Sequence, residues 1–402
     1  MKRLSNLVRA TALLLTSLVL LSGCGGGDGS STGTLRLSIT DHPACGYDNV
    51  FITVERVRVH QSENAGDADG GWHEIVLNPA RRIDLLTLTN GVLEELGQTL
   101  LPAGQYTQMR LVLASNSVHP MANSVVPTGS SEVELTTPSG QQTGLKMNVD
   151  ITVEPNEVAD FVIDFDACRS VVKAGSSGKY NLKPVVSVIP VLSDAGQRIV
   201  GYVDPATLGA TTLVSAQSGG EVVKATPPDA TSGQFVLYPV PPGTYDLVFV
   251  SSGRATAVMT GVPVVTTAHT LVGSEIVRIG LSGSTTRNAS GTVMLNGSPV
   301  DTAATVRALQ TPHNGPTVEI SSMPVDASTG AYSFTLPIGA PQMTAYSANP
   351  VAIIFAADSA DPALTAAGKY TLAASIEGLA SQTAAVDLSG SSVVTNFSFT
   401  AP

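Results

Sequence analysis

The sequence predicts an all-β protein made of tandem antiparallel β-sandwiches. Apolar and polar residues alternate with a period of two in many short runs, for example at Phe161 to Asp166, where Phe161, Ile163 and Phe165 share one face. Glycine (38 residues) and proline (25 residues) interrupt these runs, and charged residues make up only 13% of the chain. Such short amphipathic strands bury their apolar faces by packing sheet against sheet.

The N-terminus has the pattern of a secretory signal. Met1 to Arg9 carries three positive charges, and the apolar run Ala10 to Leu21 follows it. That run is about half of the roughly 20 residues that a membrane span needs, which favours a signal peptide over a transmembrane anchor. Residues 21–24, Leu-Ser-Gly-Cys, resemble the bacterial lipobox. The resemblance implies cleavage after Gly23 and acylation of Cys24.

We therefore expect a lipoprotein signal peptide at 1–23 and a flexible Gly/Ser tether at 24–33. Several acyl chains on Cys24 would give stable contact with the membrane through the N-terminal lipid. Gly25 rather than aspartate follows Cys24, which resembles the default signal for the outer membrane in Gram-negative lipoproteins. The expected location is the cell envelope, at the periplasmic or surface face of the outer membrane.

The charge balance argues against nucleic acid as a partner. Cleavage after residue 23 removes three of the 21 Lys and Arg residues and none of the 32 Asp and Glu residues, which leaves a net charge near −14. A chain this acidic is repelled by phosphate backbones and by anionic lipid.

Cysteine usage fits an exported protein. With Cys24 acylated, Cys45 and Cys168 remain, and we expect them to form a disulfide in an oxidising compartment. The closed loop of roughly 120 residues would contribute on the order of 4–5 kcal/mol in the chain-entropy model. The alternative is a pair of inert buried thiols.

The first folded unit is expected at 34–190. Leu35 to Thr40 alternates as a half-buried strand, and in the strand Val50 to His60 the apolar phase slips, which predicts a β-bulge at Glu55-Arg56. Trp72, the only tryptophan, is expected to open another strand. Val92 to Leu96 is expected to form one short helix.

A set of short motifs carries a family resemblance over residues 33–190. It comprises Ile39-Thr40-Asp41, Val54-Glu55-Arg56-Val57, Trp72, Ile83-Asp84-Leu85-Leu86, Leu101-Pro102-Ala103-Gly104-Gln105-Tyr106, Arg110-Leu111, Gly144-Leu145-Lys146, Asp164-Phe165-Asp166 and Lys179-Tyr180-Asn181-Leu182-Lys183-Pro184. Together they resemble a bacterial lipoprotein domain of unknown function. The resemblance implies a β-sandwich on an exported protein and no particular activity.

Two further units are expected at 196–281 and 287–402. The second contains Gly233-Gln234-Phe235 and Val240-Pro241-Pro242-Gly243-Thr244-Tyr245, which resemble carboxypeptidase regulatory-like and collagen-adhesin B-type sandwiches. The third repeats this order more loosely. The fold implied is a series of Greek-key, prealbumin- or immunoglobulin-like sandwiches.

A Gly-x-Tyr element recurs along the chain. Its tyrosines are expected to begin strands, to pack their rings inward and to donate their hydroxyls to nearby carbonyls, as corner tyrosines do. They are Tyr106, Tyr180, Tyr245, Tyr332 and Tyr370.

Metal chemistry has weak candidates. His42, His60, His73 and His119 show no ligand spacing, and no CxxC is present. Asp41, Asp164 and Asp166 would come together if the disulfide forms, and such a cluster could bind a cation such as calcium. The favoured alternative is that Asp164 pairs with a basic residue such as Arg36 or caps a turn.

No catalytic motif is found, so we expect a non-enzyme with no catalytic residues and no cofactor. The expected role is to present β-sandwich modules to an envelope protein or to act as a structural scaffold. A carbohydrate-binding module and an ion-stabilised adhesin are the alternatives. Few aromatic residues are left to stack on a glycan, Tyr346 and Phe355 among them, and either residue could belong to the core.

Overall fold

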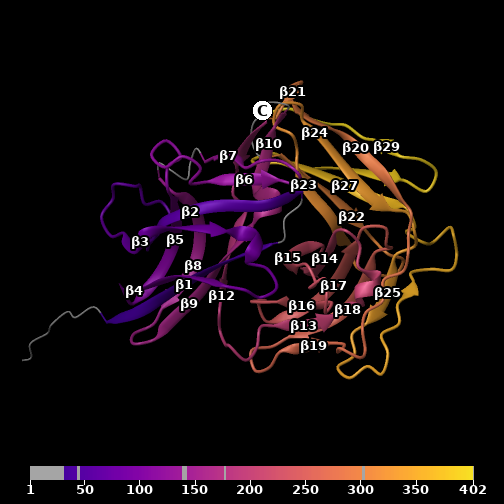
Figure 1. The fold of residues 1–402 in the computed structure, drawn as a ribbon, viewed down its shortest axis with the longest axis horizontal. Coiled ribbons are helices and arrows are strands. Elements are labelled where there is room, and N and C mark those ends of the chain that lie inside the picture. Colours follow the sequence, from indigo (N-terminus) through magenta and orange to yellow (C-terminus); the bar gives the residue numbers. More distant parts are fainter. Residues whose placement is uncertain (1–30, 43–45, 138–142, 176–177, 301–303, 402) are drawn as a thin grey trace, which may run out of the picture.

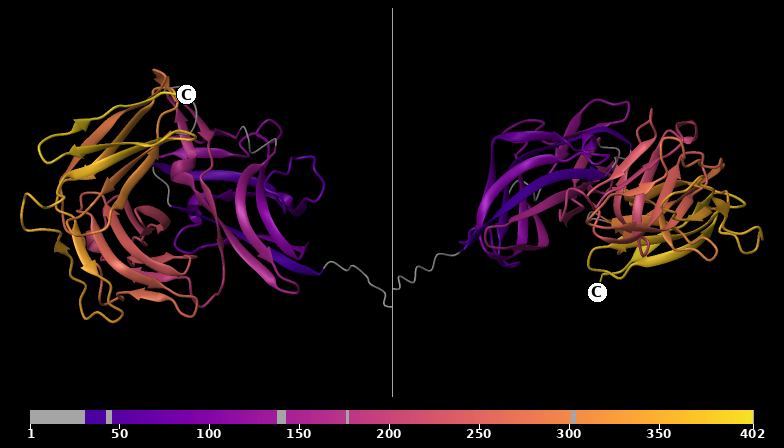
Figure 2. Two further views of the ribbon diagram at one scale, coloured as in Figure 1. Left: turned by 180° about the vertical axis from the view of Figure 1, so that it is seen from behind. Right: turned by 90° about the horizontal axis from the view of Figure 1, so that it is seen from below.

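A computed structural model describes residues 31–42, 46–137, 143–175, 178–300 and 304–401. These residues form six β-sheets, which pair into three sandwich-like units (Figure 1). The all-β prediction is confirmed. The three units gather around one another rather than extending as a string (Figures 1 and 2).

The first unit packs a four-stranded sheet, in the order β12-β9-β1-β4, against an eight-stranded sheet in the order β10-β11-β7-β6-β2-β5-β8 with β3 paired to β2. Its elements are β1 (Thr32–His42), β2 (Tyr47–His60), β3 (His73–Asp84), η1 (Leu85–Thr87), β4 (Glu94–Pro102), β5 (Gly104–Leu113), β6 (Ser124–Pro127), β7 (Val133–Thr136), β8 (Leu145–Val153), β9 (Val158–Asp166), α1 (Ala167–Ser170), β10 (Val171–Ala174), β11 (Lys179–Leu182) and β12 (Val186–Pro190).

Strand β1 organises the smaller sheet. It pairs antiparallel with β4 and parallel with β9, so Thr34 lies beside both Leu100 and Val158. The alternating residues Leu35 and Leu37 are fully buried in the core between the sheets. The sheets are therefore mixed rather than purely antiparallel, because the chain returns to β1 from a distant strand instead of a neighbouring hairpin.

The expected β-bulge in β2 is confirmed, since the register with both neighbouring strands shifts between Val54 and Arg56. The expected helix at Val92 to Leu96 is wrong: β4 begins at Glu94 and pairs with β1. Strand pairing with β1 satisfies the backbone there and outweighs the local helix preference. The helical turn lies earlier, at η1, where the carboxylate of Asp84 accepts from the Leu86 amide.

The second unit packs the sheet β16-β13-β19 against the sheet β15-β14-β17-β18-β25-β26. Its elements are β13 (Ile199–Tyr202), η3 (Pro205–Thr207), β14 (Thr212–Ser218), β15 (Glu221–Thr226), β16 (Gln234–Leu237), β17 (Gly243–Ser251), β18 (Ala257–Val264) and β19 (Thr270–Val272).

The third unit packs a sheet around β20, with β21, β24, β29 and β30, against the sheet β23-β22-β27-β28. The remaining elements are β20 (Thr286–Leu295), β21 (Ser298–Pro299), β22 (Ala304–Gln310), β23 (Val318–Pro324), β24 (Ala331–Pro337), β25 (Gln342–Ala345), β26 (Ala356–Ala357), β27 (Lys369–Ile376), β28 (Gln382–Asp387), β29 (Val393–Val394) and β30 (Phe397–Phe399).

The second and third units are joined by a strand that follows the third unit and pairs in a sheet of the second, and by strand β17, which contributes to both cores. Strand β25, which follows β24 of the third unit, pairs parallel with β18 of the second. In β17, Phe249 packs into the second unit's core, whereas Val248, on the opposite face, packs into the third unit's core. Strand β17 is therefore buried on both faces, and these two units cannot separate without exposing apolar surface.

The corner role predicted for the Gly-x-Tyr residues is confirmed for four of them. The hydroxyls of Tyr106 and Tyr245 donate to Pro102 O and Pro241 O, at 3.0 and 2.8 Å, each four residues upstream. Tyr332 donates to Thr395 O, and Tyr370 to Pro337 O. The ring of Tyr180 is buried and meets Tyr47 edge-on at a centroid distance of 6.0 Å.

Candidate functional site at the junction of the three units

The outward face of β9 forms the centre of the junction. Its residues Val162 and Asp164 alternate with the core residues Phe161, Ile163 and Phe165, yet they are buried as well. The Asp164 side chain is 0% exposed and accepts a hydrogen bond from the Nζ of Lys224, whose side chain is 3% exposed, at 2.7 Å. Because Lys224 lies on β15, this buried ion pair joins the first unit to the second.

A tight turn makes a second contact between these units. Asn90, with φ of 58°, presents its side chain to the second unit, where its Oδ1 accepts from the Val236 amide at 2.6 Å. The Asn90 amide donates to Thr226 Oγ1 at 2.7 Å. Gly91 has φ of 80°, and a Cβ there would lie 2.8 Å from Val236 Cγ1, so the close approach of the two units requires glycine.

Between the second and third units, Gln217, Glu221 and Gly220 of the second unit bind Glu319 and Arg307 of the third, and Arg307 also binds Glu319 of its own unit. The Gln217 side chain donates to Glu319 O and accepts from the Glu319 amide, both at 2.8 Å. The Arg307 guanidinium binds Glu319 at 2.5 Å and Glu221 at 2.5 Å, and it also donates to Gly220 O. Burial acts to lower the pKa of Arg307, but attraction to Glu319 and Glu221 outweighs it and the pKa is raised.

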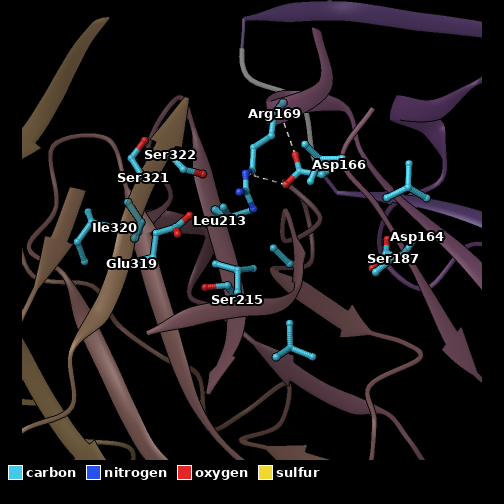
Figure 3. Close-up of a pocket in the computed structure, with 17 residues that line it drawn as sticks. Asp164, Asp166, Arg169, Ser187, Leu213, Ser215, Glu319, Ile320, Ser321 and Ser322 are labelled. Atoms are coloured by element: carbon cyan, nitrogen blue, oxygen red, sulfur yellow. Dashed lines mark hydrogen bonds and ion pairs between the residues drawn. The ribbon is translucent and has the colours of Figure 1, made fainter. Parts of the chain in front are cut away.

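The first and third units also touch, since the Ala327 amide donates to Lys173 O at 3.1 Å. All three units line one cavity of about 220 Å³ (Figure 3). The first unit contributes Arg169 and Ser187, the second contributes Ser215, and the third contributes Glu319 and Ser322. Figure 3 shows Arg169 extending into this space beside Asp166, with Glu319 on the opposite wall.

The start of α1 gathers the carboxylates of the first unit. Asp41 Oδ1 accepts from the Ala167 amide at 2.9 Å, and Asp166 Oδ1 accepts from the Arg169 amide at 2.9 Å. Asp41 is fully buried, and its Oδ2 has no hydrogen-bond partner among the described residues. Burial, followed by repulsion from Asp166 and Asp164, raises the pKa of Asp41 well above its ordinary value.

The three aspartates that the sequence offered as weak cation ligands lie on or beside the paired strands β1 and β9. Within the part of the chain that the structure describes, no group of three His, Cys, Asp or Glu side chains is placed to hold a metal ion. Asp164 has Lys224 as its partner, and the suggested partner Arg36 instead binds Asp160 at 2.5 Å. Asp166 caps a turn of helix.

The lipidation and disulfide predictions fall partly outside the described residues. Cys24 and Cys45 both lie there, so acylation and pairing remain predictions. Cys168 is in α1, between Asp166 and Arg169.

The aromatic candidates for glycan stacking are occupied by other contacts. Trp72 lies beside Arg58 and Arg110, whose guanidinium carbons are 4.5 and 4.8 Å from its ring centroid, and its Nε1 donates to Gly66 O. Phe355 meets Phe249 edge-on at 6.1 Å, and Tyr346 packs against the core of the second unit.

Sequence reasoning missed Lys224, Glu319, Arg307 and Asn90. The available signal was a charge inside an otherwise apolar strand, as in Val223-Lys224-Ala225 and Val318-Glu319-Ile320. That signal does not say whether the charge faces water or a neighbouring unit. Chemically, the junction neutralises buried charges in pairs and fixes the units to one another.

Comparison with protein families finds one match, in the first unit. Residues 32–184 form a DUF4382 domain, described as Domain of unknown function (DUF4382). The DUF4382 domain ends just before β12, so β9, α1 and Asp164 belong to it. No curated protein matches the chain.

Solved structures with some likeness include three bacterial proteins. The Bacillus anthracis TIE protein is 13% identical, with a TM-score of 0.18, and the match covers 92% of this chain but half of that one. The Streptococcal ancillary pilin is 9% identical over 91% of this chain and 98% of its own, with a TM-score of 0.17. The Corynebacterium diphtheriae major pilin SpaA is 11% identical over 92% and 99%, with a TM-score of 0.18. Likeness at this level supports no conclusion about function.

None of the described helices is long and apolar enough to cross a membrane.

Proposed function

We propose that the chain is a non-catalytic, lipid-anchored envelope protein that acts as a rigid scaffold. Its DUF4382 domain lies nearest the membrane and holds the second and third units in a fixed orientation for a partner in the envelope. The observation that carries this proposal is the junction, where the buried Asp164 of the first unit pairs with the buried Lys224 of the second.

This pairing favours a structural role over a catalytic one. A catalytic group must face a space that substrate can enter, with its charge available to the reaction. Here the Asp164 carboxylate is bound by Lys224, and the Glu319 carboxylate is bound by Arg307. The first pair joins two units, and the second neutralises a buried carboxylate within the third unit.

The anchor would be the acylated Cys24. Only six residues lie between Cys24 and Ser31, where the described chain begins, so seven Cα-to-Cα steps join them. At the maximum extension of the backbone, this tether reaches about 25 Å. The DUF4382 domain would therefore stay close to the bilayer.

The test is expression of the full chain in a Gram-negative host with a labelled fatty acid. We expect the label in the mature protein, membrane fractionation of that protein, and loss of both in Cys24→Ala. The conservative control is Cys168→Ala, which should keep the label. An unlabelled, soluble wild-type protein would refute the anchoring, and hydrolysis of a substrate by the purified protein would refute the non-catalytic role.

A further inference from the structure

Exposed apolar side chains concentrate along one edge of the molecule. Of the fourteen large hydrophobic residues that are exposed in the described part of the chain, eight lie on segments that meet at this edge. They are Leu100, Val158, Leu192, Val265, Leu271, Ile276, Val351 and Ile354.

Register and hydrogen bonds bring the segments of the DUF4382 domain to this edge. Leu100 and Val158 both flank Thr34, near the point where β1 begins. Strand β12 runs antiparallel to β9 and ends at the same side, where the Val191 amide donates to Asp160 O. Gln197 holds the linker that follows. Its side-chain Oε1 accepts from the Leu192 amide, and its backbone amide donates to Val265 O.

The second unit continues the edge with β19 and two loops. Strand β19 is the outer strand of its sheet and lies lowest among the labelled strands in Figure 1. The loops at 273–277 and 347–355 touch each other, because a Cβ on Gly273 would lie 3.0 Å from Ile353 Cδ1. From these loops Ile276, Val351 and Ile354 project into solvent, with 93, 97 and 76% of their surface exposed.

We call this surface the lower edge: the start of β1 with the neighbouring residues Leu100 and 154–158, the end of β12, residues 191–198, Val265, β19, and the loops 273–277 and 347–355. In Figure 1 and in the view from behind (Figure 2, left), the indigo start of β1 and the orange loop that follows β25 lie toward the bottom of the molecule, well apart along its long axis. The tether that would carry the lipid enters the fold at the β1 end of this edge.

We propose that the lower edge rests on the lipid bilayer and that Ile276, Val351 and Ile354 insert into the headgroup–acyl boundary as a second, apolar membrane contact. This inference rests on the proposed function, because the acylated Cys24 would hold the β1 end of the edge within about 25 Å of the bilayer. Exposed aliphatic side chains at loop tips gain free energy when they leave water for the interface, and a second contact makes a lipid anchor more stable.

The charges of the edge specify the kind of bilayer. Glu154, Glu157, Asp194 and Glu275 are exposed on its segments. Arg278, beside the apolar loops, donates to the backbone of Glu275. An acidic rim is not attracted to anionic lipid, so the surface fits a zwitterionic bilayer and binds through apolar contact alone.

The first experiment measures binding of the unacylated body to vesicles. The mature full-length chain with Cys24→Ser is floated with phosphatidylcholine vesicles. We expect weak, salt-insensitive binding that does not increase with anionic lipid. The triple substitution of Ile276, Val351 and Ile354 by serine should lower the partition coefficient about tenfold or more. The control Val394→Ser, on β29 at the opposite side of the molecule, should leave it unchanged (Figure 1).

The second experiment uses the acylated chain bound to vesicles with brominated acyl chains. Val351→Trp should be quenched and Val394→Trp should not. If the acylated protein binds but neither tryptophan is quenched, the inference is overturned and the anchor stands. If the acylated chain does not bind the vesicles, the anchor itself is refuted. The inference is also overturned if the triple variant binds vesicles as well as the parent does. It is overturned, and the edge is assigned to contact between copies, if the parent binds no vesicles but forms dimers that the triple substitution abolishes.

Discussion

Replacing Lys224 with methionine tests whether the buried ion pair holds the units together. Methionine keeps most of the apolar stem but removes the ammonium that binds Asp164 Oδ1 at 2.7 Å. The Asp164 side chain, which is 0% exposed, then loses the ammonium that binds it. Breaking one side of a buried pair costs about 3–5 kcal/mol, because the remaining charge is buried uncompensated.

The protein has two ways to respond, and they can be told apart. If the units stay docked, the whole cost of 3–5 kcal/mol appears as a lower free energy of unfolding. If opening the junction costs less, the DUF4382 domain detaches and Asp164 becomes hydrated. Detachment would increase the radius of gyration in small-angle scattering and would release the linker around Asp194 from its contacts with Gln197, so that protease cleaves it faster.

Urea unfolding, scattering and limited proteolysis should be run on Lys224→Met and on a matched control, Lys146→Met. Lys146 is an exposed lysine on β8, so its replacement should change stability by less than about 0.5 kcal/mol. The double substitution Asp164→Leu/Lys224→Met should recover at least half of the loss, since an apolar pair of similar size needs no charge compensation. A Lys224→Met protein that matches Lys146→Met in all three assays would refute the reasoning.

Three further predictions concern the same unit. The pKa of Asp41 is raised in the folded state, so folded Asp41 keeps a proton that the unfolded chain loses above about pH 4. The free energy of unfolding should therefore fall as the pH rises from about 4 toward the folded-state pKa of Asp41. Asp41→Asn keeps the acceptor for the Ala167 amide, and its denaturation midpoint should decline less with pH than that of the wild type; an unchanged pH profile would contradict this. Asn90→Ala should cost about 1–3 kcal/mol because it leaves the Val236 amide unsatisfied, whereas the exposed Asn156→Ala, which has a similar φ of 61°, should cost less than 1 kcal/mol; equal losses in urea unfolding would rule out an inter-unit role. Mass spectrometry of the unreduced protein should find Cys45 and Cys168 linked, and reduction should cost on the order of 4–5 kcal/mol; two alkylatable thiols would refute the disulfide.

The sequence predicted the strands of this protein and their inward faces better than it predicted which strands pair and which faces another unit covers. Alternation correctly placed Phe161, Ile163 and Phe165 in a core, and the slipped phase in β2 correctly predicted a bulge. These features depend on side-chain direction within one strand, which the order of residues determines. The helix predicted at Val92 to Leu96 failed because pairing with β1, more than fifty residues earlier, decides that segment.

The junction was beyond prediction for a related reason. In β9, the phase opposite the core carries Val162, Asp164 and Asp166, and such a mixed face is typical of a strand that is open to water. The second unit covers that face, and the lysine that neutralises Asp164 lies sixty residues away in the chain. Alternation distinguishes the two faces of a strand, but it does not distinguish solvent from another unit. Strand β17 did carry a local signal, since Leu247 to Val250 is continuously apolar, as expected for a strand buried on both faces.

The junction and the lower edge make one connected prediction. The lower edge is a single surface only while the DUF4382 domain and the second unit stay docked, because its segments come from both. Lys224 is buried and distant in sequence from every edge residue, so Lys224→Met changes no group that would touch lipid. If the substitution detaches the units, the loops bearing Ile276 and Val351 lose their fixed orientation relative to the anchored domain, and the advantage of two linked contacts is reduced. Quenching of Val351→Trp by brominated lipid should then fall in the Lys224→Met background, but not in the Lys146→Met background, while the acylated chain remains membrane-bound in both. Undiminished quenching in a protein shown by scattering to have opened would mean that the loops reach the bilayer without the junction.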